Sequence, residues 1–135
     1  MSKIILTKLQ CIVNDEVDED EVFLKYNGDK IWPESGLYKG IDISETFELD
    51  IEINVDDPKK TIAIELWDFD YLSANDFLGT FEMVLGTDTN GAFSTSMKLK
   101  EKGSTASYIL FCLAQVLGLP EAQCSHIQNM TVSYS

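Results

Sequence analysis

The chain has 135 residues with 23 acidic and 10 basic side chains, which gives a formal net charge of −13. This length fits one domain, and 44% hydrophobic with 24% charged residues is ordinary for a globular protein with a real core. Such an acidic surface argues against nucleic-acid binding, because a nucleic-acid-binding protein needs clustered Lys and Arg side chains. It also argues against unaided binding to an anionic membrane. We expect no transmembrane segment, because no stretch approaches the roughly 20 apolar residues that a spanning helix needs.

The N-terminal sequence and the spacing of the cysteines favour a cytoplasmic location. The first apolar run is too short for a signal peptide and is broken by Thr7 and Lys8. We therefore expect a soluble, cytoplasmic protein. The three cysteines, Cys11, Cys112 and Cys124, have no paired or CxxC spacing and are predicted to be reduced; the first two lie in apolar runs and are predicted to be core residues.

Turn signals recur at short spacing along the chain, and the runs between them alternate apolar and polar residues as strands do. Asn27-Gly28 predicts a two-residue hairpin turn, because both residues tolerate positive φ, and Glu34–Ser44 is predicted to be a loop. The predicted strands, in chain order, are Ile4–Val13, Val22–Tyr26, Lys30–Trp32, Thr46–Val55, Thr61–Trp67, Leu78–Leu85, Phe93–Leu99 and Ser107–Leu113.

Eight short strands with almost no helical periodicity predict an all-β fold, an eight-stranded antiparallel β-sandwich. Two one-sided sheets bury each other's apolar faces in such a fold. We expect residues 1–113 to form the sandwich and residues 114–135 to form an irregular or short-helical C-terminal tail of unknown role. Period-2 alternation predicts the following inward-facing residues: Phe47, Leu49, Ile51, Ile62, Ile64 and Leu66.

An acidic stretch follows the predicted strand Thr61–Trp67. Asp68 and Asp70 lie two residues apart, so in extended backbone they point the same way, and Asp76 returns to meet them if Tyr71–Asn75 form a loop. Three converging carboxylates repel one another, which without a cation would leave the loop strained, mobile or partly protonated. Oxygen-only ligands on a flexible loop favour calcium, which takes about 6–8 oxygens in loose geometry. The alternative is a purely structural acidic turn between strands.

This stretch resembles the third loop of a C2 domain, the calcium- and phospholipid-binding β-sandwich. The family's pattern there is Asp-x-Asp, five intervening residues and a further Asp, often as Trp-Asp-x-Asp followed by Asn-Asp-Phe-Leu/Ile-Gly, and Glu65–Gly79 matches it. The resemblance covers about residues 3–113. It implies a C2-like sandwich in which Asp68, Asp70 and Asp76 bind calcium, and which docks on a phospholipid membrane surface or on a protein partner.

A second acidic cluster lies where the C2 family places its first calcium loop. Asn14–Glu21 holds six carboxylates in eight residues. The family usually shows an Asp and, six residues later, another in Asp-Pro-Tyr-Val-Lys. Matching this pattern pairs Asp15 with Glu21, and a one-residue shift pairs Asn14 with Asp20; the Asp-Pro step is missing. The resemblance implies Asp15, Asp20 and Glu21 as further metal ligands, whereas a charge run this dense is also typical of a solvated loop.

The resemblance also suggests membrane-tip residues. In C2 domains, residues between the second and last Asp of the third loop can enter lipid; here these positions are Tyr71 and Leu72, with Val17 on the first loop. Calcium would neutralise the acids and bridge to phosphate, while the apolar tips enter the interface. The alternative is that Tyr71 and Leu72 fold back on the domain.

We do not expect an enzyme. The sequence has no Gly-rich phosphate loop, no GxSxG and no HExxH, and its one histidine, His126, leaves little for a Ser-His or Cys-His pair. Two alternatives to the calcium-dependent module remain. One is a calcium-independent protein-interaction or structural domain on the same fold, and the other is a carbohydrate-binding or hydrolytic sandwich. Gathered carboxylate oxygens would favour calcium, and a concave face lined with aromatic residues would favour carbohydrate.

Overall fold

The computed structural model describes residues 2–14, 19–86, 90–100 and 105–116. Every regular element in these ranges is a strand, and none of them contains a helix long and apolar enough to span a bilayer. The strands are β1 (Ser2–Val13), β2 (Asp20–Tyr26), β3 (Asp29–Trp32), β4 (Lys39–Ile41), β5 (Thr46–Val55), β6 (Thr61–Asp68), β7 (Asp76–Val84), β8 (Gly91–Ser96), β9 (Lys98–Leu99) and β10 (Ser107–Val116).

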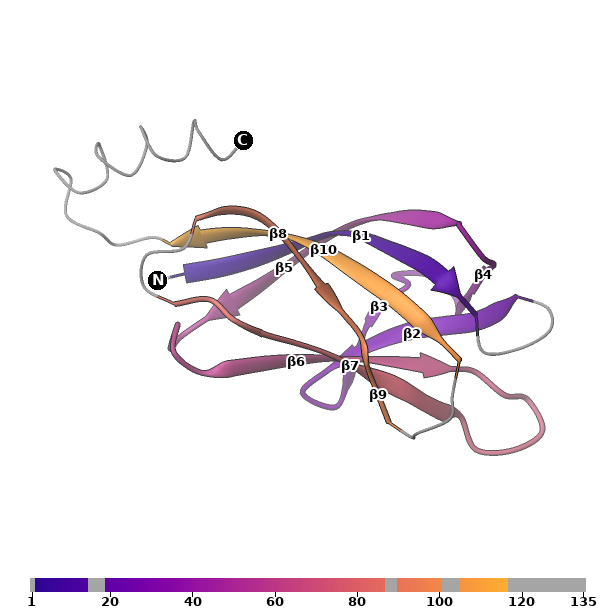
Figure 1. The fold of residues 1–135 in the computed structure, drawn as a ribbon. Helices are drawn as coiled ribbons and strands as arrows, with labels where there is room; N and C mark the ends of the chain where they lie inside the picture. The colour runs from indigo at the N-terminus through magenta and orange to yellow at the C-terminus, as the bar shows by residue number, and fades with distance from the viewer. Residues whose placement is uncertain (1, 15–18, 87–89, 101–104, 117–135) are drawn as a thin grey trace, which may run out of the picture.

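These strands form two antiparallel sheets that lie face to face, which confirms the predicted sandwich. The first sheet has the order β5-β1-β10-β8, and the second has the order β3-β2-β6-β7-β9, with β4 also paired to β2. In Figure 1 the sheet that contains β1 and β10 lies above the sheet that contains β2, β6 and β7. All eight predicted strands are present, one of them divided into β8 and the two-residue β9, and the three-residue β4 is a strand that was not predicted.

Most strand boundaries lie within two residues of the predicted ones, and three differences are larger. β4 lies inside the predicted loop Glu34–Ser44, because a three-residue strand centred on Gly40 carries no alternation signal. The predicted strand Phe93–Leu99 divides at Met97 into β8 and β9, because the chain there leaves the first sheet and joins the second. β10 continues to Val116, three residues beyond its predicted end, and the rest of the predicted tail lies outside the described residues.

The predicted turn and core are confirmed. Asn27 and Gly28 have φ of 52° and 85° between β2 and β3, as a two-residue hairpin requires. Cys11 and Cys112 are buried with free thiols. Leu49, Ile62, Ile64 and Leu66 are buried between the sheets, and Phe47 and Ile51 pack against this core while half-buried.

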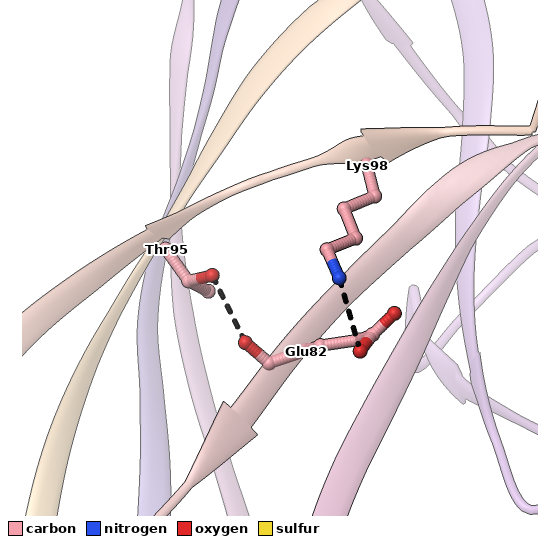
Figure 2. A network of polar contacts seen from close by, with 3 residues as sticks. All are labelled: Glu82, Thr95 and Lys98. Atoms are coloured by element: carbon pink, nitrogen blue, oxygen red, sulfur yellow. Dashed lines mark hydrogen bonds and ion pairs between the residues drawn. The ribbon is translucent and has the colours of Figure 1, made fainter.

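The sandwich is closed along the side where β8 meets β7. Thr95 Oγ1 donates a hydrogen bond to the backbone carbonyl of Glu82 at 3.2 Å, and Lys98 Nζ lies 3.4 Å from Glu82 Oε2 (Figure 2). The ion pair is exposed and contributes little to stability. The bond from Thr95 matters more, because it gives a partner to a carbonyl of β7 beyond that strand's short pairing with β9.

Candidate functional site

One end of the sandwich brings together acidic side chains from three neighbouring strands; we call it the acidic end. Asp68, the last residue of β6, lies opposite Val22 of β2 and opposite Asp76 of β7 in the antiparallel registers. Opposite residues share a face of a sheet, and so do residues two apart on a strand, so Asp20 joins Asp68 and Asp76 on the inward face. Asp20 and Asp68 are 0% and 3% exposed, whereas Asp76 is exposed.

Asp68 is held by the backbone at the start of β2. Its Oδ1 accepts a hydrogen bond from the N–H of Glu21 at 2.9 Å, and the N–H of Phe69 donates to the carbonyl of Glu21 at 2.7 Å. Strand alternation places the side chain of Glu21 on the face of β2 opposite to that of Asp20. The backbone of Glu21 therefore contacts Asp68, and its carboxylate lies on the other side of the sheet.

The carboxylate of Asp20 contacts the other sheet. Tyr108 of β10 donates a hydrogen bond from its hydroxyl to Asp20 Oδ2 at 2.5 Å. Burial and then this bond raise the pKa of Tyr108 above its ordinary value. Cys11 of β1 is the register partner of Tyr108, and burial also raises the pKa of its thiol. Asp20 is thus part of a buried polar link between the sheets.

Asp70 organises the loop between β6 and β7. Its Oδ1 accepts the N–H of Leu72 at 2.8 Å, its Oδ2 accepts the hydroxyl of Ser73 at 2.7 Å, and its own N–H donates to Asn75 Oδ1 at 2.9 Å. The hydrogen bond from Ser73, followed by that from Leu72, lowers the pKa of Asp70. The expectation of a partly protonated loop is therefore wrong for Asp70, because the donors of the loop itself stabilise its charge.

The donor chemistry of the acidic end fits calcium, since it consists of carboxylate oxygens on a loop and three strand ends. The predicted convergence is not present, however: within the described ranges no group of three or more His, Cys, Asp or Glu side chains is placed to hold a metal ion. The reason is that Asp20 is turned toward Tyr108, while the oxygens of Asp70 accept bonds from their own loop. Asp15 lies outside the described residues. The proposed ligand set, namely Asp68, Asp70, Asp76, Asp20 and Glu21 with Asp15, stays a prediction.

The two predicted tip residues of this loop differ in their surroundings. Leu72 is 97% exposed, and Tyr71 is 72% exposed. The ring of Tyr71 stands edge-on to Phe69 at 4.8 Å and to Tyr38 at 6.3 Å between ring centroids. Hydrogen bonding to Tyr71, and then to Glu21, raises the pKa of the Tyr38 hydroxyl. Tyr71 therefore rests partly on the domain, whereas Leu72 projects into solvent.

Further apolar side chains are exposed at the same end, and sequence reasoning did not single them out. Ile12 and Val13 end β1 with 40% and 37% exposure, and Ile43, in the turn from β4 to β5, is 54% exposed. Backbone hydrogen bonds to Cys11 hold this turn against the end of β1. The only sequence signal was their position next to acidic or turn segments. Val17, the third predicted tip residue, lies outside the described residues.

Comparisons with known proteins agree with this architecture. The family model described as C2 domain matches residues 43–102. The structure also resembles a solved C2 domain, the one designated A, of plant extended synaptotagmin 1, with a TM-score of 0.50 and 14% sequence identity over 87% of this chain and 95% of that one. The protein has the C2 domain fold. No curated protein matches the chain.

The match to the C2 family model covers only one of the two acidic segments. Residues 43–102 include Asp68, Asp70 and Asp76 but do not reach the first acidic cluster, which precedes them in the chain. The resemblance that the third loop suggested is confirmed at the level of the C2 fold. Because one fold supports many functions, the binding chemistry has to be argued from the acidic end itself.

Proposed function

We propose that this C2 domain is a calcium-dependent docking module that attaches to a phospholipid membrane through its acidic end. One observation carries the proposal: Asp68 and Asp76 lie opposite each other in the register, Asp70 lies in the loop that joins them, and the fully projecting Leu72 stands beside it. The first three residues would hold the ion through carboxylate oxygens. Calcium, when bound, would neutralise these acids and bridge to lipid phosphate oxygens.

Charge explains why such docking would need the cation. A chain of net charge −13 is repelled by an anionic lipid surface until the acids that face the membrane are neutralised. Apolar side chains then add affinity, because burying one Leu or Ile side chain fully contributes about 1.5–3 kcal/mol. Leu72 and Ile43 are exposed at this end and supply that surface. The protein would be peripheral to the membrane and bind it reversibly.

A second candidate is a calcium-independent protein-interaction domain that uses the same end. Two hydrogen bonds favour it, since Asp20 accepts from Tyr108 and Asp70 accepts from Ser73, so that donors of the protein itself already bind these carboxylate oxygens. The neighbouring aromatic rings of Tyr38 and Tyr71 would suit a protein partner, because Tyr is enriched at interfaces. A basic protein surface would then take the place of the lipid.

Calorimetric titration of calcium into chelator-treated protein separates the two candidates. If the function depends on calcium, the wild type should release or absorb heat on binding calcium, and Asp76→Asn should bind calcium more weakly. The matched control is Asp56→Asn, which removes the same charge from an exposed acid in the turn between β5 and β6, at the other end of the sandwich. Its calcium affinity should equal that of the wild type.

Cosedimentation with phosphatidylserine vesicles completes the test. The wild type should sediment with vesicles in calcium and remain in solution in chelator. Absence of calcium heat together with vesicle binding in chelator would overturn the calcium role. Absence of both would leave the protein-interaction candidate in front.

A further inference from the structure

The two long sides of the sandwich differ. On one side Thr95 and Glu82 join β8 to β7, as described above (Figure 2). On the other side β5 is the last strand of its sheet and pairs with β1 alone among the described strands. Its residues Ile51–Val55 pair one for one with β1, so this half of the strand is regular and extended. An edge strand of this kind carries a row of backbone N–H and C=O groups that point away from the sheet.

A groove runs beside this edge, between β5 and β3. It has a volume of about 600 Å³, and its apolar lining includes Trp32 and Pro33 from the β3 side and Ile51 from β5. The ring centroids of Trp32, at the end of β3, and Phe47 of β5 lie 5.8 Å apart, so the two strands are in contact. The groove therefore offers an apolar floor next to an open strand edge, which is the combination that peptide-binding sheet edges use.

The charges around the groove are mainly acidic. Asp50 and Glu34 are exposed at its rim and make no ion pair within the part of the chain that the structure describes, while Glu52 pairs with Lys3 at 3.0 Å. Lys30, the one basic residue of the groove lining, directs its ammonium at the carbonyl of Gly36. A partner would thus meet uncompensated carboxylates above an apolar floor.

We propose that this groove binds an extended peptide in which basic and apolar residues alternate, and that the peptide adds to the first sheet as a strand beside β5. Its backbone would pair with the open edge of β5. Its apolar side chains would face Trp32 and Ile51, and its Lys or Arg side chains would lie opposite Asp50 and its neighbours on the outer face. This site lies along the side of the sandwich and is independent of the acidic end.

Charge also distinguishes this partner from a second copy of the chain. The outward residues of β5 include Glu48, Asp50 and Glu52, all exposed. Two copies of β5 paired edge to edge would place acids opposite or diagonal to acids, and like charges across strands are destabilising. The same acids that keep β5 from pairing with itself leave it open to a basic strand.

The test uses the full chain in chelator, so that calcium plays no part. The probe is a short synthetic peptide of alternating Lys and Val, with a Glu and Val peptide as its control. Calorimetry measures the affinity, and hydrogen exchange measures the protection of the β5 amides. We expect the Lys peptide to bind and to protect Ile51–Val55, and the Glu peptide not to bind.

Two charge reversals of equal size make the test specific. Asp50→Lys changes the rim of the groove, and Glu82→Lys changes an exposed acid of β7 on the opposite long side of the sandwich. Both positions are solvent-exposed, so both variants should fold, which far-UV circular dichroism checks. Asp50→Lys should weaken binding of the Lys peptide by about tenfold or more, because a charge pair becomes a repulsion, and Glu82→Lys should change it by much less.

Three results would overturn the proposal. Equal weakening by both variants would mean that the peptide responds only to overall charge. Binding without added protection of β5 would place the peptide elsewhere. Protection of β5 that rises with protein concentration in the absence of peptide would mean that the edge pairs with a second copy.

Discussion

The hydroxyl of Tyr108 in β10 donates a hydrogen bond to Oδ2 of Asp20 in β2 at 2.5 Å, and this bond joins the two sheets at the acidic end. Tyr108 and Asp20 are 1% and 0% exposed, so the bond lies out of contact with water. It fixes the residue at which the first acidic segment enters β2. The position of Asp20 therefore depends on a tyrosine from β10.

Removing this hydroxyl should destabilise the fold. Tyr108→Phe keeps the ring but deprives the buried carboxylate of Asp20 of one donor, and the loss of a hydrogen bond to a charged group costs about 1.5–3 kcal/mol. Urea unfolding followed by tryptophan fluorescence measures the change. A variant as stable as the wild type would show that the link adds nothing to the stability of the sandwich.

The same pair predicts a dependence on alkaline pH. The pKa of Tyr108 is raised from 10.0 in the folded protein by burial and by Asp20, so the unfolded chain loses this proton first. The contribution of Tyr108 is therefore fully present below pH 10 and is lost as the pH rises above it. The stability difference between the wild type and Tyr108→Phe should shrink above pH 10. A difference that stays constant across this range would contradict the assignment.

Gly79 should not tolerate a side chain. A Cβ at this residue of β7 would collide with the backbone carbonyl of Lys98 and contact Met97 Cγ at 2.8 Å. Gly79→Ala should displace β9 and lower the free energy of unfolding by about 1–3 kcal/mol, as overpacking typically does. The melting temperature checks this, and an unchanged value would mean that β9 moves away at no cost.

Most of the strands and the hairpin turn could be predicted from the sequence, because alternation and turn chemistry are properties of neighbouring residues. Leu49, Ile64 and Leu66 are buried as their period-2 spacing predicted. The sheet change at Met97 could not be predicted in this way, because it depends on which edges of the sandwich have room for another strand.

The acidic end was predictable only in part. The spacing of Asp68, Asp70 and Asp76 pointed to the correct loop, and the register places the first and last of them opposite each other. The partner of Asp20 was not predictable, because Tyr108 is distant in sequence and meets it only across the two sheets. Repulsion alone gave the wrong direction for the pKa of Asp70, because it ignored the donors Leu72 and Ser73 in the same loop.

Substitutions of the two tip residues, Leu72 and Tyr71, should differ in their effect on stability. Leu72 is 97% exposed, so Leu72→Ala should change stability by no more than about 0.5 kcal/mol, while it weakens calcium-dependent binding to vesicles. Tyr71→Ala also removes ring contacts to Phe69 and Tyr38, so it should lower the melting temperature as well. Vesicle cosedimentation and thermal melts measure both quantities. Unchanged vesicle binding by Leu72→Ala would exclude insertion at this loop.

The melting temperature of chelator-treated protein, with and without millimolar calcium, tests the calcium-dependent role most directly. A ligand that binds only the folded state stabilises it by about 2.7 kcal/mol at a hundredfold excess over its dissociation constant, so calcium should raise the wild-type value. Asp70→Asn should lose most of this gain, and Asp56→Asn should keep it. Without calcium, Asp70→Asn should bring no stabilisation, because the lowered pKa of Asp70 means that the fold favours its charge. A melting temperature that does not respond to millimolar calcium would contradict the proposed function.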